Sequence, residues 1–174
     1  MTATPCLFPD MEVRPVYQGG GASYMVKVQA LKVSEGLPTM ECNTPEAAYR
    51  YWKSVISLQP WFDVSKEHLI VLALNTRYRI TDFAMVSIGT LNESLAHPRE
   101  ILRPVIVLGA YGFMMMHNHP SGDPTPSEAD HRLTRRIKEC ADLLQVRMLD
   151  HVITGEPTPE KPRPFFSFLE AGVI

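Results

Sequence analysis

The stretch HNHPSGDPTPSEAD, at residues 117–130, combines two histidines, a proline-rich loop and an acidic residue. His117 and His119 lie two positions apart at the end of an apolar run, and side chains with this spacing on a strand point to the same side of a sheet. After the stiff loop, Ser127 is expected to begin a helix with Asp130 in its first turn, facing back toward the strand end. Two imidazoles and one carboxylate can hold zinc and leave a fourth tetrahedral position for water. The stretch therefore predicts a zinc site made by His117, His119 and Asp130.

The same residues also have a purely structural interpretation. Ser127 can cap a helix whose positive end favours Asp130, and a histidine pair at a strand end can be an ordinary surface feature. Each explanation accounts for part of the stretch. We favour the metal site because all three side chains fall within fourteen residues and the loop chemistry is also present.

Outward from this stretch, strands and helices are mixed along the chain. Apolar and alternating runs predict strands at 69–74, 83–88, 112–117 and 146–153, with a closing segment at 165–169. Helices are predicted at 45–57, after the capping residue Thr44, and at 127–144. A further helix begins at Pro98, and Pro104 should interrupt or kink it. The predicted fold class is α/β, of the mixed α+β kind.

The length of 174 residues fits one domain. Residues 1–43, rich in Gly and Pro, are predicted to be an N-terminal lead-in with a strand at 24–33. Residues 44–174 are predicted to form the domain itself.

Composition and charge argue against several classes of protein. No apolar run approaches the roughly 20 residues of a membrane span, and the first residues lack the features of a secretory signal, so we expect a cytoplasmic protein without a membrane partner. Cys6, Cys42 and Cys140 are widely spaced and are predicted to be free thiols. A net charge of −2 gives no general attraction to nucleic acid. The one basic cluster, within residues 132–138, is interpreted as a solvated helix face.

The sequence resembles the JAB/MPN metallohydrolases with the JAMM motif and, within them, the RadC-like domains. The match is carried by HNHPSGDPTPSEADHRLT at 117–134 and LDHVI at 149–153, with IGTLN at 88–92 and HPRE at 97–100 upstream. It covers about residues 45–174. The resemblance implies a JAB/MPN-like (cytidine-deaminase-like) fold, in which a central mixed β-sheet is flanked by helices. It also implies a zinc metalloprotease or deubiquitinase-like enzyme acting on a protein or peptide substrate, including a ubiquitin-like conjugate.

The JAMM pattern further implies a glutamate that acts as general base and a serine that polarises the substrate carbonyl. Ser127 matches the serine, and we expect this role to compete with capping of the helix. Glu67, just ahead of the strand at 69–74, is the preferred base. Glu100 is the alternative, although an acid that starts a helix is already explained by the helix dipole. Asp150 and His151 belong to the resemblance without an assigned role, and we expect His151 to be a core residue with one hydrogen bond rather than a ligand.

Two other functions are kept beside the hydrolase. One is a RadC-type accessory protein in DNA repair, whose JAB domain binds rather than cuts. RadC-like proteins carry a helix-hairpin-helix region ahead of this domain, and residues 1–43 are too short and too rich in Pro and Gly to supply it, so DNA is the less favoured partner. The other is a scaffold that binds metal without catalysis.

Overall fold

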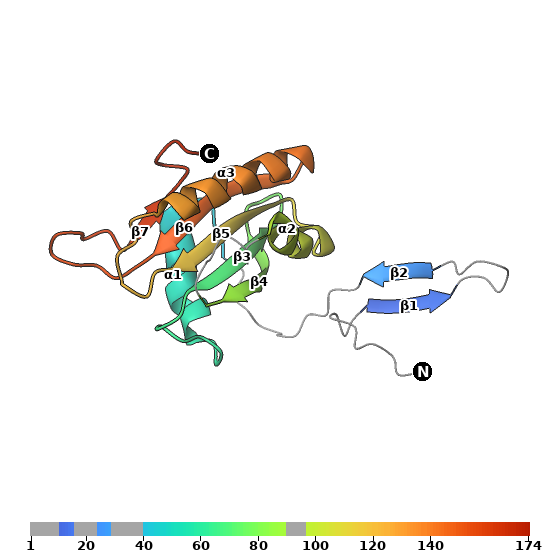
Figure 1. Ribbon diagram of the computed structural model, residues 1–174, viewed down its shortest axis with the longest axis horizontal. Helices are drawn as coiled ribbons and strands as arrows, with labels where there is room; N and C mark the ends of the chain where they lie inside the picture. The colour runs from blue at the N-terminus through green and yellow to red at the C-terminus, as the bar shows by residue number, and fades with distance from the viewer. Residues whose placement is uncertain (1–10, 16–23, 29–39, 90–96) are drawn as a thin grey trace. The chain divides into compact units, whose positions relative to one another are not determined.

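A computed structural model describes residues 11–15, 24–28, 40–89 and 97–174 of the chain (Figure 1). The chain divides into two compact units, Met1–Gly36 and Leu37–Ile174. In the smaller unit, β1 (Met11–Pro15) pairs antiparallel with β2 (Tyr24–Val28). The predicted strand at 24–33 is therefore present over 24–28, and the rest of it lies outside the described residues, as does Cys6.

Among the described residues of the larger unit, five strands form one mixed sheet in the order β4-β3-β5-β6-β7 (Figure 1). The strands are β3 (His68–Leu74), β4 (Ile80–Ile88), β5 (Gly112–Asn118), β6 (Arg147–Thr154) and β7 (Phe165–Ser167). β3 is antiparallel to both β4 and β5, β5 and β6 are parallel, and β7 returns antiparallel to β6. β3 and β5 are buried along their whole length, which explains their continuous apolar sequences.

Helices cover both faces of this sheet. They are α1 (Pro45–Ser54), followed by the short 3-10 helix η1 (Ile56–Leu58), α2 (Pro98–Val107) and α3 (Glu128–Leu143). Because neighbouring strand residues point to opposite faces, β3 contributes Ile70 and Leu72 to a core shared with α1, and Leu69 and Val71 to a core shared with α2 and α3. The predicted fold class, a mixed β-sheet flanked by helices, is confirmed.

Two local predictions need correction. The first helix ends at Ser54 rather than 57, and η1 continues the chain. Pro104 does not interrupt the helix that starts at Pro98, because α2 runs through it to Val107. Proline removes one backbone donor there, but the helix buries Ile101 and Val105 completely, and this burial offsets the missing hydrogen bond.

Two further expectations concern thiols and membranes. Both cysteines in the described part of the chain, Cys42 and Cys140, are free. None of the helices among the described residues has the length and apolarity needed to cross a membrane.

The sheet brings distant segments to one end. Leu69 at the start of β3 pairs with His117 near the end of β5, while Asn118 at the end of β5 pairs with Thr154 at the end of β6. Glu67 directly precedes β3. The loop after β5 then leads into the first turn of α3, so this end of the sheet carries every residue predicted for the metal site.

Candidate metal centre

Within the described residues, four side chains meet at this end of the sheet. Ligand atoms of Glu67, His117, His119 and Asp130 all lie within 4.8 Å of one another. His117 comes from β5, His119 from the start of the following loop, and Asp130 from the first turn of α3. The three predicted ligands and the preferred base are thus brought together.

The distances between donor atoms fit a single metal ion. The two Nε2 atoms of His117 and His119 are 3.1 Å apart, and His117 Nε2 lies 3.3 Å from Asp130 Oδ1. His119 Nε2 lies 3.7 Å from Asp130 Oδ2. Donors about 2.0–2.1 Å from a tetrahedral zinc are roughly 3.3–3.4 Å apart. One ion can therefore contact all three side chains, and two imidazoles with one carboxylate are a donor set that zinc accepts.

Glu67 is fixed beside these donors through its neighbours. The side chain of Asn118 accepts a hydrogen bond from His68 N at 3.0 Å and donates one to Lys66 O at 2.9 Å, so both residues flanking Glu67 are tied to the end of β5. Glu67 Oε1 lies 3.6 Å from His117 Nε2. The side chains of Glu67 and His119 are 16% and 18% exposed, whereas those of His117 and Asp130 are buried, so the cluster opens to solvent beside Glu67 and His119.

Glu100 lies elsewhere. It forms ion pairs on α2 with Arg103 at 2.9 Å and with Arg99 at 3.2 Å, and it is not one of the four clustered residues. Its position in the first turn agrees with the helix-dipole explanation.

Ser127 and Asp130 form a reciprocal cap at the start of α3. Ser127 Oγ accepts a hydrogen bond from Asp130 N at 3.2 Å, while Asp130 Oδ2 accepts from Ser127 N at 2.7 Å and from Ser127 Oγ at 2.6 Å. Burial alone would raise the pKa of Asp130, but its interactions with His117, His119 and Ser127 outweigh burial and lower the pKa well below its usual value. Asp130 is therefore ionised, with Oδ2 in the cap and Oδ1 facing His117. The structural and metal interpretations of this residue are compatible.

The structure shows Ser127 in its capping role, and its role toward a substrate carbonyl stays a prediction. Capping uses a lone pair of the hydroxyl oxygen, whereas polarising a carbonyl would use its proton. The proton is held by Asp130 Oδ2 instead. Since Ser127 N also donates to that oxygen, the hydroxyl can turn away without leaving Oδ2 unpaired.

The loop between His119 and α3 is fastened at several points. His119 Nδ1 lies 2.8 Å from Asp123 O, which directs Nε2 toward the cluster. The Asp123 carboxylate accepts hydrogen bonds from Lys161 Nζ and from Thr125, and these contacts, that of Lys161 most, lower the pKa of Asp123. Burial lowers the pKa of His119, but Asp130, the Asp123 carbonyl and the charge of Glu67 raise it by more. The cluster therefore favours positive charge at its centre.

Behind His117 lie His151, which was expected in the core, and Thr134, whose part in the site was not predicted from the sequence. His117 Nδ1 is 2.9 Å from His151 Nε2, and His151 Nδ1 is 2.6 Å from Thr134 Oγ1. The expected single hydrogen bond of His151 is wrong, because both ring nitrogens have partners. Burial, with a further contribution from His117, lowers the pKa of His151 well below its usual value, so the ring is neutral. One sequence signal was present: Thr134 lies four residues after Asp130, on the same face of a helix.

Asp150 fastens β6 to the C-terminal segment. It accepts hydrogen bonds from His151 N, Leu169 N and Ser167 Oγ. Burial raises its pKa to about 6 despite these bonds. The segment places the Phe168 ring in parallel contact with the His151 ring, at 4.7 Å between centroids.

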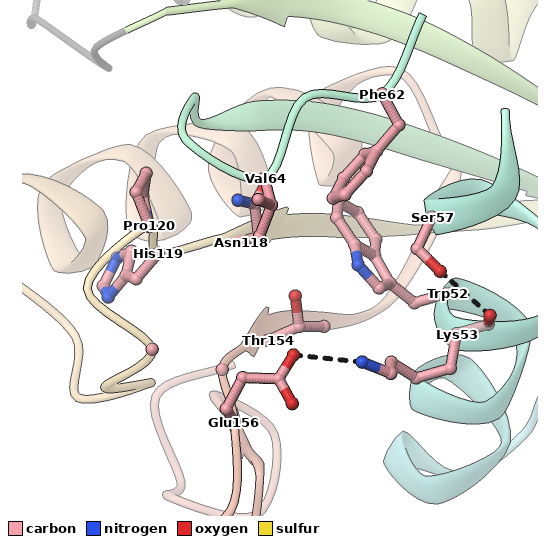
Figure 2. A pocket seen from close by; sticks show the side chains of 12 residues that line it. Trp52, Lys53, Ser57, Phe62, Val64, Asn118, His119, Pro120, Thr154 and Glu156 are labelled. Carbon is pink, nitrogen blue, oxygen red and sulfur yellow. Dashed lines mark hydrogen bonds and ion pairs between the residues drawn. The ribbon is translucent and has the colours of Figure 1, made fainter. Parts of the chain in front are cut away.

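A pocket of about 100 Å³ adjoins His119 on the α1 side of the sheet (Figure 2). Trp52, Phe62 and Val64 supply apolar walls. An ion pair of 3.0 Å between Lys53 and Glu156 borders another side, as Figure 2 shows. The cluster is therefore bordered by a small, largely apolar pocket.

Comparison with known proteins agrees with the fold. The family model of the RadC-like JAB domain matches residues 42–173. A UPF0758 protein of Chlorobaculum parvum is 53% identical over 93 residues, which are 53% of this chain and 42% of that protein. A UPF0758 protein of Trichlorobacter lovleyi is 42% identical over 112 residues (64% and 46%), and one of Geobacter sulfurreducens is 37% identical over 131 residues (75% and 52%).

The chain spans about half the length of the curated relatives it matches. In the described part of the chain, the family match takes in the five-stranded sheet, the helices α1, η1, α2 and α3, and all four clustered residues. The chain therefore belongs to the family of RadC-like JAB domains.

Proposed function

We propose that this protein is a zinc-dependent metallohydrolase that cleaves a peptide or isopeptide bond. The observation that supports the proposal most is the meeting of two imidazoles and two carboxylates within 4.8 Å in a RadC-like JAB domain. His117, His119 and Asp130 would hold the metal. Zinc bound there would lower the pKa of a water molecule and polarise the carbonyl of the substrate.

Glu67 would move the proton. It lies beside the ligands, on the side of the cluster that opens to solvent. From there it can accept a proton from the attacking water and deliver it to the leaving amine, a contribution of roughly 10²–10⁴ in rate. Glu100 is engaged with two arginines of α2 and has no comparable position.

Ser127 would stabilise the developing negative charge on the carbonyl oxygen. Its hydroxyl proton would turn from Asp130 Oδ2 toward that oxygen, and Ser127 N would keep its bond to Oδ2. The helix cap would survive, because the Ser127 oxygen still accepts from Asp130 N.

The pocket beside His119 supports a polypeptide substrate. Its apolar walls, made by Trp52, Phe62 and Val64, suit a side chain next to the cleaved bond. We propose a protein or peptide substrate on this basis, and a ubiquitin-like tail joined to lysine is one member of the class.

The alternative function is DNA binding without cleavage, as a RadC-type accessory domain. It is supported by the family membership and by three exposed arginines on α3, namely Arg132, Arg135 and Arg136. Salt-dependent binding of duplex DNA would support this alternative.

Turnover of zinc-loaded protein on mixed peptides and isopeptide-linked lysine conjugates tests the proposal. Glu67→Gln should reduce turnover roughly a hundred-fold or more with zinc retained, because Gln keeps the shape of Glu but cannot carry the proton. The matched control Glu100→Gln should keep turnover. Loss of turnover in Glu100→Gln with activity kept in Glu67→Gln would contradict the placement of the base. A fully zinc-loaded native protein that cleaves none of these substrates but binds DNA would favour the alternative.

A further inference from the structure

A row of hydrogen bonds leads from His117 into the core through His151 to Thr134. The contacts of Thr134 determine which atom donates and which accepts in each of these bonds. Thr134 Oγ1 lies 2.6 Å from the carbonyl oxygen of Asp130. A carbonyl oxygen can only accept, so the single hydroxyl proton of Thr134 points to it. Toward His151 Nδ1, also at 2.6 Å, the hydroxyl must then accept. His151 therefore carries a proton on Nδ1.

The position of this proton determines the tautomer of His117 as well. The His151 ring is fully buried, and its two nitrogens lie against a hydroxyl and an imidazole rather than against a carboxylate, so burial favours a ring with a single proton. With that proton on Nδ1, the Nε2 atom offers a lone pair. His117 Nδ1 lies 2.9 Å from that lone pair and must donate to it. The other ring nitrogen of His117, Nε2, is the atom that faces His119 and Asp130. A neutral imidazole with its proton on Nδ1 leaves Nε2 bare, which is the form that binds a metal.

We propose that His151, backed by Thr134, is a positioning residue that selects the metal-binding tautomer of His117. The proposal rests on the metal site proposed above. It does not require His151 to contact the metal, since its Nε2 is occupied by His117.

The surroundings hold the His151 ring in the orientation this role needs. Phe168 stacks on the ring with 7° between the planes, and Phe168 N donates to the His151 carbonyl at 3.0 Å. Asp150 accepts from the backbone of Leu169 and from the Ser167 hydroxyl, which fixes the residues on both sides of Phe168. The C-terminal segment thus restrains the ring that orients His117.

Two substitutions at Thr134 test the role, because Val keeps the shape of Thr without the hydroxyl and Ser keeps the hydroxyl without the methyl group. Thr134→Val removes the hydroxyl that accepts the hydrogen bond from His151 Nδ1. Without this acceptor, His151 can carry its proton on Nε2 instead. His117 would then carry its own proton on Nε2, where the metal should bind. We expect the zinc affinity, measured by competition with a chromophoric chelator, to fall by roughly 10- to 100-fold. Thr134→Ser keeps a hydroxyl and should restore affinity to within about three-fold.

A second pair acts at His151 itself. Gln can place its side-chain oxygen near the position of Nε2 and accept from His117, whereas Leu fills space without an acceptor. His151→Leu should therefore lose zinc affinity and His151→Gln should keep most of it. Equal, native-like affinity in His151→Leu and Thr134→Val would overturn the proposal.

Nitrogen-15 NMR of the metal-free native protein gives a readout independent of zinc, of activity and of any variant. His151 should show its proton on Nδ1 before any metal is added, and a predominant Nε2–H form of His151 would overturn the proposal. Failure of the proposed function looks different. A protein with the expected tautomer and tight zinc binding but no cleavage of peptides would contradict the hydrolase while leaving the role of His151 in place.

Discussion

The buried carboxyl group of Asp150 predicts an unusual dependence of stability on pH. The residue is fully buried, and burial raises its pKa to about 6. In the unfolded chain the pKa is about 3.9. Because the folded protein holds the proton more tightly, the free energy of unfolding should fall as pH rises from about 4 to about 6 and level off above. At about 1.4 kcal/mol per unit of pKa, the difference between the folded and unfolded pKa values of Asp150 corresponds to roughly 3 kcal/mol of unfolding free energy.

Asp150→Asn removes this titration with little change in shape. The Asn carbonyl can accept from His151 N and Leu169 N, and its amide can donate to Ser167 once that hydroxyl rotates. Urea unfolding of both proteins between pH 4 and pH 7 gives the difference in unfolding free energy, in which the other titrating groups cancel. As pH rises over that interval, the variant should become more stable relative to the native protein by roughly 3 kcal/mol.

Asp142→Asn is the matched control. Asp142 is exposed and pairs with Lys138 on α3, so its replacement should change stability by only about 0.5 kcal/mol. A difference between native protein and Asp150→Asn that does not vary with pH would show that burial does not raise the pKa of Asp150. A native protein that gains stability over the variant as pH rises would show that the three hydrogen bonds outweigh burial.

Two further substitutions test the metal cluster and its loop. His119→Ala should lose most of the zinc, because two ligands give neither the chelation nor the geometry of three, and full zinc content by metal analysis would show that the ligands are wrong. In Gly155→Ala the added Cβ would lie 2.2 Å from Gly122 O, so the loop must shift, and thermal unfolding should report a loss of roughly 1–3 kcal/mol. Gly172→Ala has no atom within 4 Å of its new Cβ and serves as the comparison, in which only the positive φ of 70° should cost stability, by about 1 kcal/mol. Unchanged stability of Gly155→Ala would contradict the steric explanation.

The metal cluster was predictable because its proposed ligands are close in sequence. His117 and His119 share a strand end, and Asp130 falls in the first turn of the next helix, so strand and helix periodicity alone indicate that they face one another. Glu67 lies fifty residues before His117 and joins them through the pairing of Leu69 with His117. Local sequence patterns do not show which strands pair, so the family resemblance was needed to prefer Glu67 over Glu100.

The contact between His151 and His117 was not predictable from local sequence patterns. His151 faces His117 through the parallel pairing of β5 and β6, and an irregularity between Phe113 and Met114 shifts the register of that pairing. A shift of one residue changes which side chains share a face. The predicted interruption at Pro104 failed for a different reason. The low helix propensity of proline is outweighed by the burial of neighbouring residues in α2.

We expect this end of the sheet to bind one zinc ion. The most direct test is the metal content of protein purified without chelators and measured by elemental analysis. The two imidazoles and the carboxylate of the cluster predict about one zinc per chain. A folded protein that contains no transition metal, and takes up none when zinc is added, would exclude a zinc site at this end of the sheet.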